Sequence, residues 1–181
     1  MFKNIYLCLA ISIGVIAAIL TALIYLLAET PSIDTAFGTT ITTMVPPAFI
    51  SWALYFAHGQ SGTSFWKVGI TNTIGVIVAS LIVIIGVVVV NGMMGLPVWL
   101  GLGIGVLIGA FIMTYEATFT PLDFVPGAFC GCATAFALGA TYALGGAETF
   151  LPVIQIILAF WIGLVCAFAS EKWGNAMLKS E

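Results

Sequence analysis

Two stretches of this chain have nearly the same sequence although they lie far apart. One begins Val45-Pro46-Pro47-Ala48-Phe49 and the other begins Val125-Pro126-Gly127-Ala128-Phe129. Aligned over 45–59 and 125–139, eight of fifteen positions are identical. Each stretch opens an apolar segment with a proline. The pattern predicts an internal duplication, and duplicated segments with interrupted helices in a membrane protein indicate a solute pathway.

Weaker matches flank the two stretches in the same order. Ile13-Gly14-Val15 aligns with Ile104-Gly105-Val106, and Asn72 aligns with Gln155. We therefore expect repeat 1 over about 5–91 and repeat 2 over about 97–169. Each repeat holds three spans. After an odd number of spans the chain has changed sides, so the second repeat enters the bilayer from the opposite side and is inverted. The sequence thus predicts a 3+3 inverted repeat about a pseudo-two-fold axis in the membrane plane.

The membrane class follows from composition. The chain is 62% hydrophobic and only 6% charged, with a mean hydropathy of +1.22. So few charged side chains cannot cover the surface of a soluble domain of this size. We expect an all-α membrane protein with one transmembrane domain over 1–181, because a span needs roughly 20 apolar residues. The six predicted spans are 5–28, 36–57, 68–91, 97–115, 124–143 and 150–169, followed by a cytoplasmic tail over 170–181.

The second span is interrupted by four threonines and by the Pro46-Pro47 pair. Proline starts a helix well but breaks it from within. The second and fifth spans are therefore predicted to be proline-started or proline-broken. A five-span interpretation, with 30–45 re-entrant or interfacial, stays open.

Charge placement favours six spans. In that topology all lysines face one side, which the positive-inside rule makes cytoplasmic, together with both termini. The loops on the other side carry only acids. The lysines are Lys3, Lys67, Lys172 and Lys179, and the acids of the outer loops are Glu29, Asp34 and Glu148.

Several functions are disfavoured by what the chain lacks. Its four cysteines lie inside predicted spans without a Cys-x-x-Cys spacing, so neither a disulfide framework nor a metal site is predicted. There is no nucleophile–base set, phosphate loop or cofactor fingerprint. We expect no enzyme activity, no catalytic residue and no cofactor, and no nucleic-acid partner because a basic stripe is missing.

Pro46 and Pro126 are the first pathway candidates. A helix that begins inside the bilayer presents free amides and a partial positive charge to a solute. Phe49 and Phe129 follow at equivalent positions and predict an aromatic constriction. The alternatives are two helices that simply begin at the headgroups, and two rings that contact lipid.

Polar side chains inside the spans are the second group of candidates. Asn72 and Gln155 are amides, and Ser51 and Thr134 add hydroxyls to the same route. A buried amide costs a few kcal/mol without partners, so each is expected to face a polar interior. Such amides suit neutral hydrogen-bonding solutes, although they also join helices without any transport role.

Three titratable residues could gate or couple transport to protons. Glu116 and Asp123 flank the short fourth loop, and His58 ends the second span. The simpler interpretation is that all three are solvated at the membrane surface.

The run Phe124-Val125-Pro126-Gly127-Ala128-Phe129, followed by Gly131-Cys132-Ala133-Thr134, resembles the DUF1097 family of small bacterial inner-membrane proteins. The resemblance implies a polytopic protein of the bacterial inner membrane and supplies neither a substrate nor a catalytic residue. The extended Glu29–Thr43 stretch departs from the family pattern.

Three function classes remain. The first is a channel or facilitator for a small, mostly neutral solute such as urea, a short amide or ammonia, crossing between the two repeats. The second is a proton-coupled transporter of a small weak acid, and the third is a membrane scaffold subunit in which glycine-lined helix faces carry the function. The lipid bilayer and a small solute are the expected partners, and the 19.0 kDa chain is expected to form a homo-oligomer.

Overall fold

The structure is a computed structural model that describes residues 5–34, 40–118, 120–139 and 150–178. These residues form helices and no strand, which confirms the all-helical class. The elements are α1 (Ile5–Ala28), α2 (Pro31–Asp34), the 3-10 helix η1 (Ile41–Met44), α3 (Val45–Ala57), α4 (Gly62–Val83), the π-helix η2 (Ile84–Met93), α5 (Val98–Tyr115), the 3-10 helix η3 (Glu116–Thr118), α6 (Val125–Ala137) and α7 (Phe150–Met177).

Four of the described helices are long and apolar enough to cross a membrane. They are Ile5–Ala28, Gly62–Met93, Val98–Thr118 and Phe150–Met177. The other two predicted spans correspond to the shorter apolar helices Ile41–Ala57 and Val125–Ala137. Thirteen residues of α-helix extend only about 20 Å, against a hydrocarbon core of about 30 Å. Residues 36–39 and 140–143 of the predicted spans lie outside the described residues.

Identical residues of the repeat begin and end α3 and α6. Proline occupies the first turn of both helices. Both are followed by a glycine with positive φ, 106° at Gly59 and 67° at Gly139. The two glycine amides donate to the carbonyls of Phe56 and Phe136, so each glycine closes its helix. The repeated sequence therefore encodes two thirteen-residue helices with the same start and stop signals.

Several predicted boundaries are wrong. The fifth span, expected over 124–143, is a helix that ends at Ala137. The span predicted from residue 68 begins at Gly62, because the Ser61 hydroxyl accepts a hydrogen bond from the Ser64 amide and caps α4. The last span does not end at residue 169, since α7 continues to Met177. Most of the predicted tail 170–181 is therefore helical, and residues 179–181 lie outside the described part of the chain.

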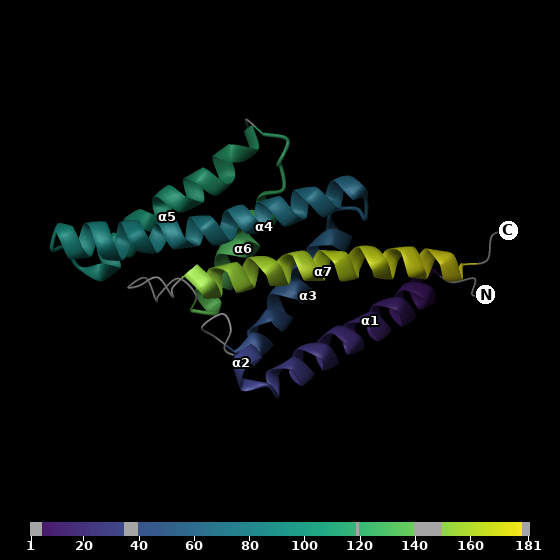
Figure 1. The fold of residues 1–181 in the computed structure, drawn as a ribbon. Coiled ribbons are helices and arrows are strands. Elements are labelled where there is room, and N and C mark those ends of the chain that lie inside the picture. Colours follow the sequence, from purple (N-terminus) through teal and green to yellow (C-terminus); the bar gives the residue numbers. More distant parts are fainter. Residues whose placement is uncertain (1–4, 35–39, 119, 140–149, 179–181) are drawn as a thin grey trace.

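The long helices α4 and α7 run side by side in opposite directions through the middle of the molecule (Figure 1). Helix α6 packs mainly on α4, and α3 packs mainly on α7. Helix α1 lies along α7, whereas α5 lies along α4 and η2. Helices α1 and α4 begin, and α7 ends, toward the same end of the molecule (Figure 1).

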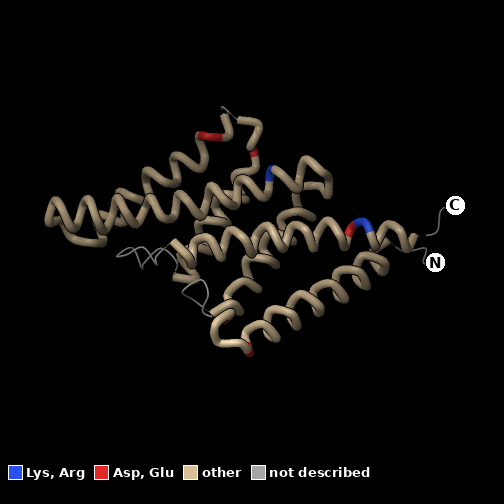
Figure 2. The backbone as a smooth tube through the Cα atoms, in the orientation of Figure 1, with Lys and Arg blue, Asp and Glu red and all other residues tan. Residues whose placement is uncertain are grey.

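Charged residues of the described chain lie near helix ends and loops, with long uncharged stretches between them (Figure 2). Lys67 lies early in α4 and Lys172 late in α7, so both belong to the end where α1 begins. Glu29 and Asp34 follow α1 at the opposite end. Many large apolar side chains are exposed on the helices, as expected for surfaces in contact with lipid.

Candidate functional site

Asn72 lies near the middle of α4 and is completely buried. Neither its side-chain nitrogen nor its side-chain oxygen has a hydrogen-bond partner. A buried amide group left unpaired costs about 1–3 kcal/mol. Buried polar groups without partners are rare in native proteins, so Asn72 is a candidate functional position.

The helix that covers Asn72 approaches it at backbone distance. A Cβ atom added at Gly131 in α6 would lie 2.1 Å from the Asn72 carbonyl oxygen, and one added at Gly75 would lie 1.9 Å from the Ala128 carbonyl oxygen. Gly127 is equally close to the Thr71 hydroxyl, at 2.2 Å from its Oγ1 atom. Glycine is therefore required at these three positions, because any side chain would separate α6 from α4.

Gln155 has a different environment from Asn72. Its side-chain nitrogen donates to the Thr40 carbonyl at 3.0 Å and to the Thr43 hydroxyl at 3.1 Å. These bonds hold the segment that leads into η1 and α3 against α7. The Gln155 amide is thus engaged in joining helices, which is the structural alternative considered for both amides.

The two hydroxyls of the predicted route bond to backbone carbonyls. Ser51 Oγ is a donor within reach of both the Ala48 carbonyl at 3.0 Å and the Phe160 carbonyl at 2.7 Å. Thr134 Oγ1 donates to the Cys130 carbonyl at 2.7 Å. Ser51 therefore connects α3 to α7, whereas Thr134 makes this bond within α6.

Pro46 and Pro126 lie in the first turns of α3 and α6, as the sequence predicted. Phe49 and Phe129 are 41% and 43% exposed on the surface of the protomer. The Phe49 ring packs on Trp52 with centroids 5.9 Å apart, and no ring contact joins it to Phe129. The two rings do not form a constriction in this structure.

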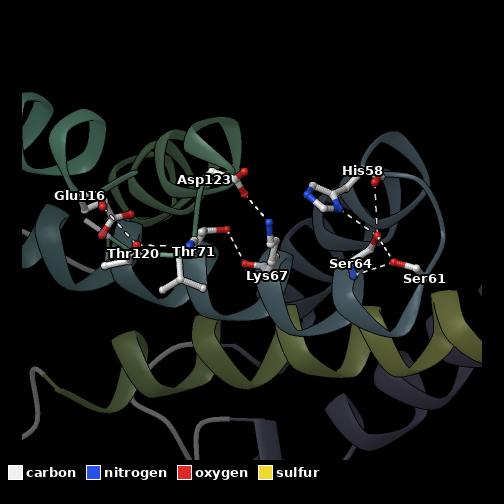
Figure 3. A network of polar contacts seen from close by, with 9 residues as sticks. His58, Ser61, Ser64, Lys67, Thr71, Glu116, Thr120 and Asp123 are labelled. Carbon is white, nitrogen blue, oxygen red and sulfur yellow. Dashed lines mark hydrogen bonds and ion pairs between the residues drawn. The ribbon is translucent and has the colours of Figure 1, made fainter. Parts of the chain in front are cut away.

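A polar network lies where α3 ends, α4 begins and the 120–124 segment passes over them (Figure 3). His58 Nδ1 lies 2.8 Å from Ser64 Oγ, and the His58 ring contacts the Phe124 ring edge-on. Lys67 forms an ion pair with Asp123 across the loop. The hydrogen bond and charge of Lys67 lower the pKa of the Asp123 carboxyl, which stays ionised at neutral pH.

Glu116 belongs to the same region and shows one unexplained feature. One of its carboxylate oxygens is buried without a hydrogen-bond partner. It follows α5, where Gly105 and Gly109 face α4, at the end of the segment Val98–Thr118 that is apolar enough to span. Of the three titratable candidates, His58 and Asp123 have partners and only Glu116 has an oxygen left unpaired.

Glu171 is a buried acid that the sequence analysis missed. Only 9% of its surface is exposed, and its Oε2 accepts a hydrogen bond of 2.5 Å from the Tyr55 hydroxyl. Asn175 donates to the other oxygen at 3.3 Å. The sequence placed Glu171 in the cytoplasmic tail 170–181, because it follows the predicted last span. The spacing of Glu171 and Asn175, two polar residues one helical turn apart, is the sequence signal that could have placed it on a helix.

The fold and these contacts define a class, the multi-pass helical membrane proteins. Within that class the chain belongs to the family described as protein of unknown function DUF1097, whose model matches residues 10–175. No curated protein matches the chain, and no solved structure matches it.

Proposed function

We propose that the protein is a passive channel or facilitator for small, mostly neutral polar solutes of the urea, short amide or ammonia class. The observation that carries the proposal is Asn72, an amide buried inside the candidate membrane-spanning helix Gly62–Met93 with both polar groups unpaired. A solute that loses water in the bilayer needs replacement donors and acceptors. Asn72 offers one of each without any charge.

The proposal includes the 3+3 inverted repeat with six spans. The first half consists of α1, α3 and α4 with η2, and the second of α5, α6 and α7. Each short helix packs mainly on the long helix of the other half, α3 on α7 and α6 on α4. The first helix of each half follows the same rule, α1 on α7 and α5 on α4. Each of these contacts of the first half with the second thus has a counterpart from the second half to the first. A two-fold axis between the halves produces such paired contacts.

Close backbone contacts support the same relation residue by residue. Gly163 in α7 lies against α3, where an added Cβ would be 2.0 Å from the Ala48 carbonyl oxygen. Gly75 in α4 lies against the Ala128 carbonyl oxygen of α6 in the same way, at 1.9 Å. Ala48 and Ala128 are identical positions of the repeated sequence. The contacts therefore align α7 with α4 so that Gly163 corresponds to Gly75.

This register changes which residue of the second half is the repeat equivalent of Asn72. The Phe160 carbonyl accepts from Ser51, and the Asn72 carbonyl lies against Gly131, which is the repeat equivalent of Ser51. The contacts therefore pair Asn72 with Phe160, whereas the sequence match paired it with Gln155. The proposed pathway has one amide at this level instead of two.

The first helices of the two halves give an independent check of the register. Ser12 in α1 donates to the Ser170 carbonyl of α7 at 2.8 Å. Gly105 in α5 lies against the Ile82 carbonyl of α4, with an added Cβ 2.6 Å from the oxygen. Ser170 and Ile82 correspond in the register set by Gly163 and Gly75. This third pair of contacts fits the register when Ser12 is aligned with Gly105, two positions from the sequence match, which aligned Gly14 with Gly105.

Solute flux into proteoliposomes tests the proposal. Stopped-flow assays with urea, acetamide and ammonia should show uptake, and Asn72→Leu should lower it by about tenfold or more, since a dehydrated solute loses partners worth about 1–3 kcal/mol. Thr114→Val is the control, because this hydroxyl is exposed on α5. Asn72→Leu removes an unpaired amide, so its thermal stability should not fall. Wild-type protein that passes none of these solutes contradicts the proposal.

A second candidate function, proton-coupled transport of a small weak acid, is favoured by the unpaired buried oxygen of Glu116. The two candidates differ in their energy source. Passive flux is indifferent to a protonophore, whereas coupled uptake collapses with it and with Glu116→Gln. Flux that survives both treatments supports the passive channel.

Assembly and location complete the proposal. We place the protein in the bacterial inner membrane with both termini in the cytoplasm, as a homo-oligomer with one pathway per protomer. Helix α1 begins and α7 ends at the same end of the molecule, which supports placing both termini on one side of the membrane. A scaffold subunit without transport is the outcome if correctly assembled protein carries no solute.

A further inference from the structure

Helices α3 and α6 are equivalent in the proposed repeat but are packed unequally. Both span thirteen residues, both have proline in the first turn, and both end before a glycine with positive φ. Each lies on the long helix of the other half. Differences between them therefore measure how firmly each half holds its short helix.

The side chains of α3 are the larger ones. Trp52 and Tyr55 of α3 correspond to Cys132 and Ala135 of α6. The two aromatic residues are 4% and 0% exposed, and they pack with apolar residues of α1, α4 and α7. A buried indole and phenol contribute far more contact area than a thiol and a methyl group. Large buried side chains therefore hold α3 in place, whereas α6 is held by close backbone contacts at Gly75 and Gly131.

Hydrogen bonds show the same inequality. Ser51 donates to the Phe160 carbonyl at 2.7 Å and Tyr55 donates to Glu171 at 2.5 Å, so two bonds join α3 to α7. At the equivalent positions α6 has Gly131 and Ala135, which have no side-chain donor. Within the part of the chain that the structure describes, no side-chain hydrogen bond joins α6 to α4.

Open space also surrounds α6. A cavity of about 230 Å³, open to the protein surface, lies between α4, α5 and α6, where Cys132 and Phe129 form part of the wall. A second open cavity of about 210 Å³ lies between α6 and the start of α3, lined by Pro46, Ile50 and Thr134 among others. Helix α6 therefore borders space that is open to the surface on two sides. At the position equivalent to Cys132, α3 carries the buried Trp52.

We infer that α6 is the moving gate of the protein and that α3 is its fixed counterpart. A shift of α6 toward the cavities separates Gly131 from the Asn72 backbone carbonyl and loosens the packing of α4 at the residue that carries the unpaired amide. This role for α6 rests on the proposed function, because the gate admits the solute to Asn72. The inequality between the two helices does not depend on any transport activity.

Hydrogen–deuterium exchange of the whole protein in lipid nanodiscs tests the inference directly. Peptides from 45–57 and 125–137 provide an internal comparison of two helices of equal length. We expect the amides of α6 to exchange about tenfold faster than those of α3, the factor that a loss of one or two net hydrogen bonds gives. Equal protection of the two helices, or faster exchange in α3, overturns the inference.

Two variants move the comparison in opposite directions. Tyr55→Phe removes only the hydroxyl that joins α3 to Glu171, so exchange in α3 should rise toward the rate of α6 while α6 is unchanged. Cys132→Phe should fill part of the cavity beside α6 and slow its exchange severalfold. If exchange in α6 is unaffected by filling the cavity, the space beside it is not what allows it to move, and the inference fails.

Flux measured on the same Cys132→Phe protein separates the two proposals. Slower exchange of α6 together with lower solute flux supports both. Slower exchange with unchanged flux keeps α6 as the mobile helix but removes it as the gate, which overturns the inference while wild-type uptake still supports a channel. Unequal exchange in a protein that passes no solute contradicts the proposed function and the gate role together.

Discussion

The Tyr55 hydroxyl in α3 donates a 2.5 Å hydrogen bond to Glu171 in α7, across 116 residues of sequence. Both residues are buried, and no ion pair to Glu171 forms among the described residues. A buried carboxylate is costly unless donors surround it. Tyr55 and Asn175 supply those donors. The packing of α3 on α7 therefore lowers the cost of burying Glu171, and Glu171 in turn holds α3 against α7.

The first prediction concerns this bond. Tyr55→Phe should lower the free energy of unfolding by about 1–3 kcal/mol, because Glu171 loses a donor while it stays buried. Glu171→Gln should cost less, since a neutral amide retains an oxygen acceptor and is cheaper to bury. Thermal unfolding in detergent measures both. The control is Tyr25→Phe, which removes an exposed hydroxyl and should leave stability unchanged.

The second prediction compares two glycines in long helices. Gly163→Ala should destabilise the protein by about 1–3 kcal/mol, because the new methyl group would lie 2.0 Å from the Ala48 carbonyl oxygen and force α3 away from α7. Gly103→Ala, which meets nothing within 4 Å, should leave stability unchanged or raise it slightly. Equal effects of the two substitutions in a thermal melt would contradict the assigned contact.

Local signals were the part of this fold that the sequence predicted well. The proline starts of α3 and α6 follow from backbone rules that act within a few residues. The end of α6 before Gly139 was not predicted, because the fifth span was expected to continue to residue 143. The bounds of α1 also follow from its continuous apolar run. These features need no knowledge of the neighbouring helices.

Tertiary relations were the part that the sequence could not predict. The match of Asn72 with Gln155 rested on the places of the two amides in the apolar runs that begin near Val68 and Leu151. The register between α4 and α7 is instead marked by where glycines admit a carbonyl of another helix, as Gly75 and Gly163 do. The placement of Glu171 likewise depends on a tyrosine in a distant helix, which no local pattern reveals.

The third prediction is a pH dependence. Lys67 lowers the pKa of Asp123, so the ion pair stabilises the folded protein above the ordinary carboxyl pKa, and this contribution is lost as the pH falls through the lowered value. The effect is small, because the Asp123 side chain is 63% exposed. Melting temperatures of wild type and Asp123→Asn should differ at neutral pH and converge in acid. Glu29→Gln, at the opposite end of the molecule, should show no such convergence.

The last prediction concerns topology. In a protein with its four native cysteines replaced, single cysteines at positions 34 and 148 should react with an impermeant maleimide added outside intact cells, and those at 61 and 179 should not. The physical reason is that Lys67, Lys172 and the other two lysines all fall on one side of a six-span chain, the side that stays cytoplasmic. Permeabilised cells provide the control, because positions 61 and 179 must then react. Labelling of position 179 but not of position 61 in intact cells would require an odd number of spans and would remove the inverted repeat.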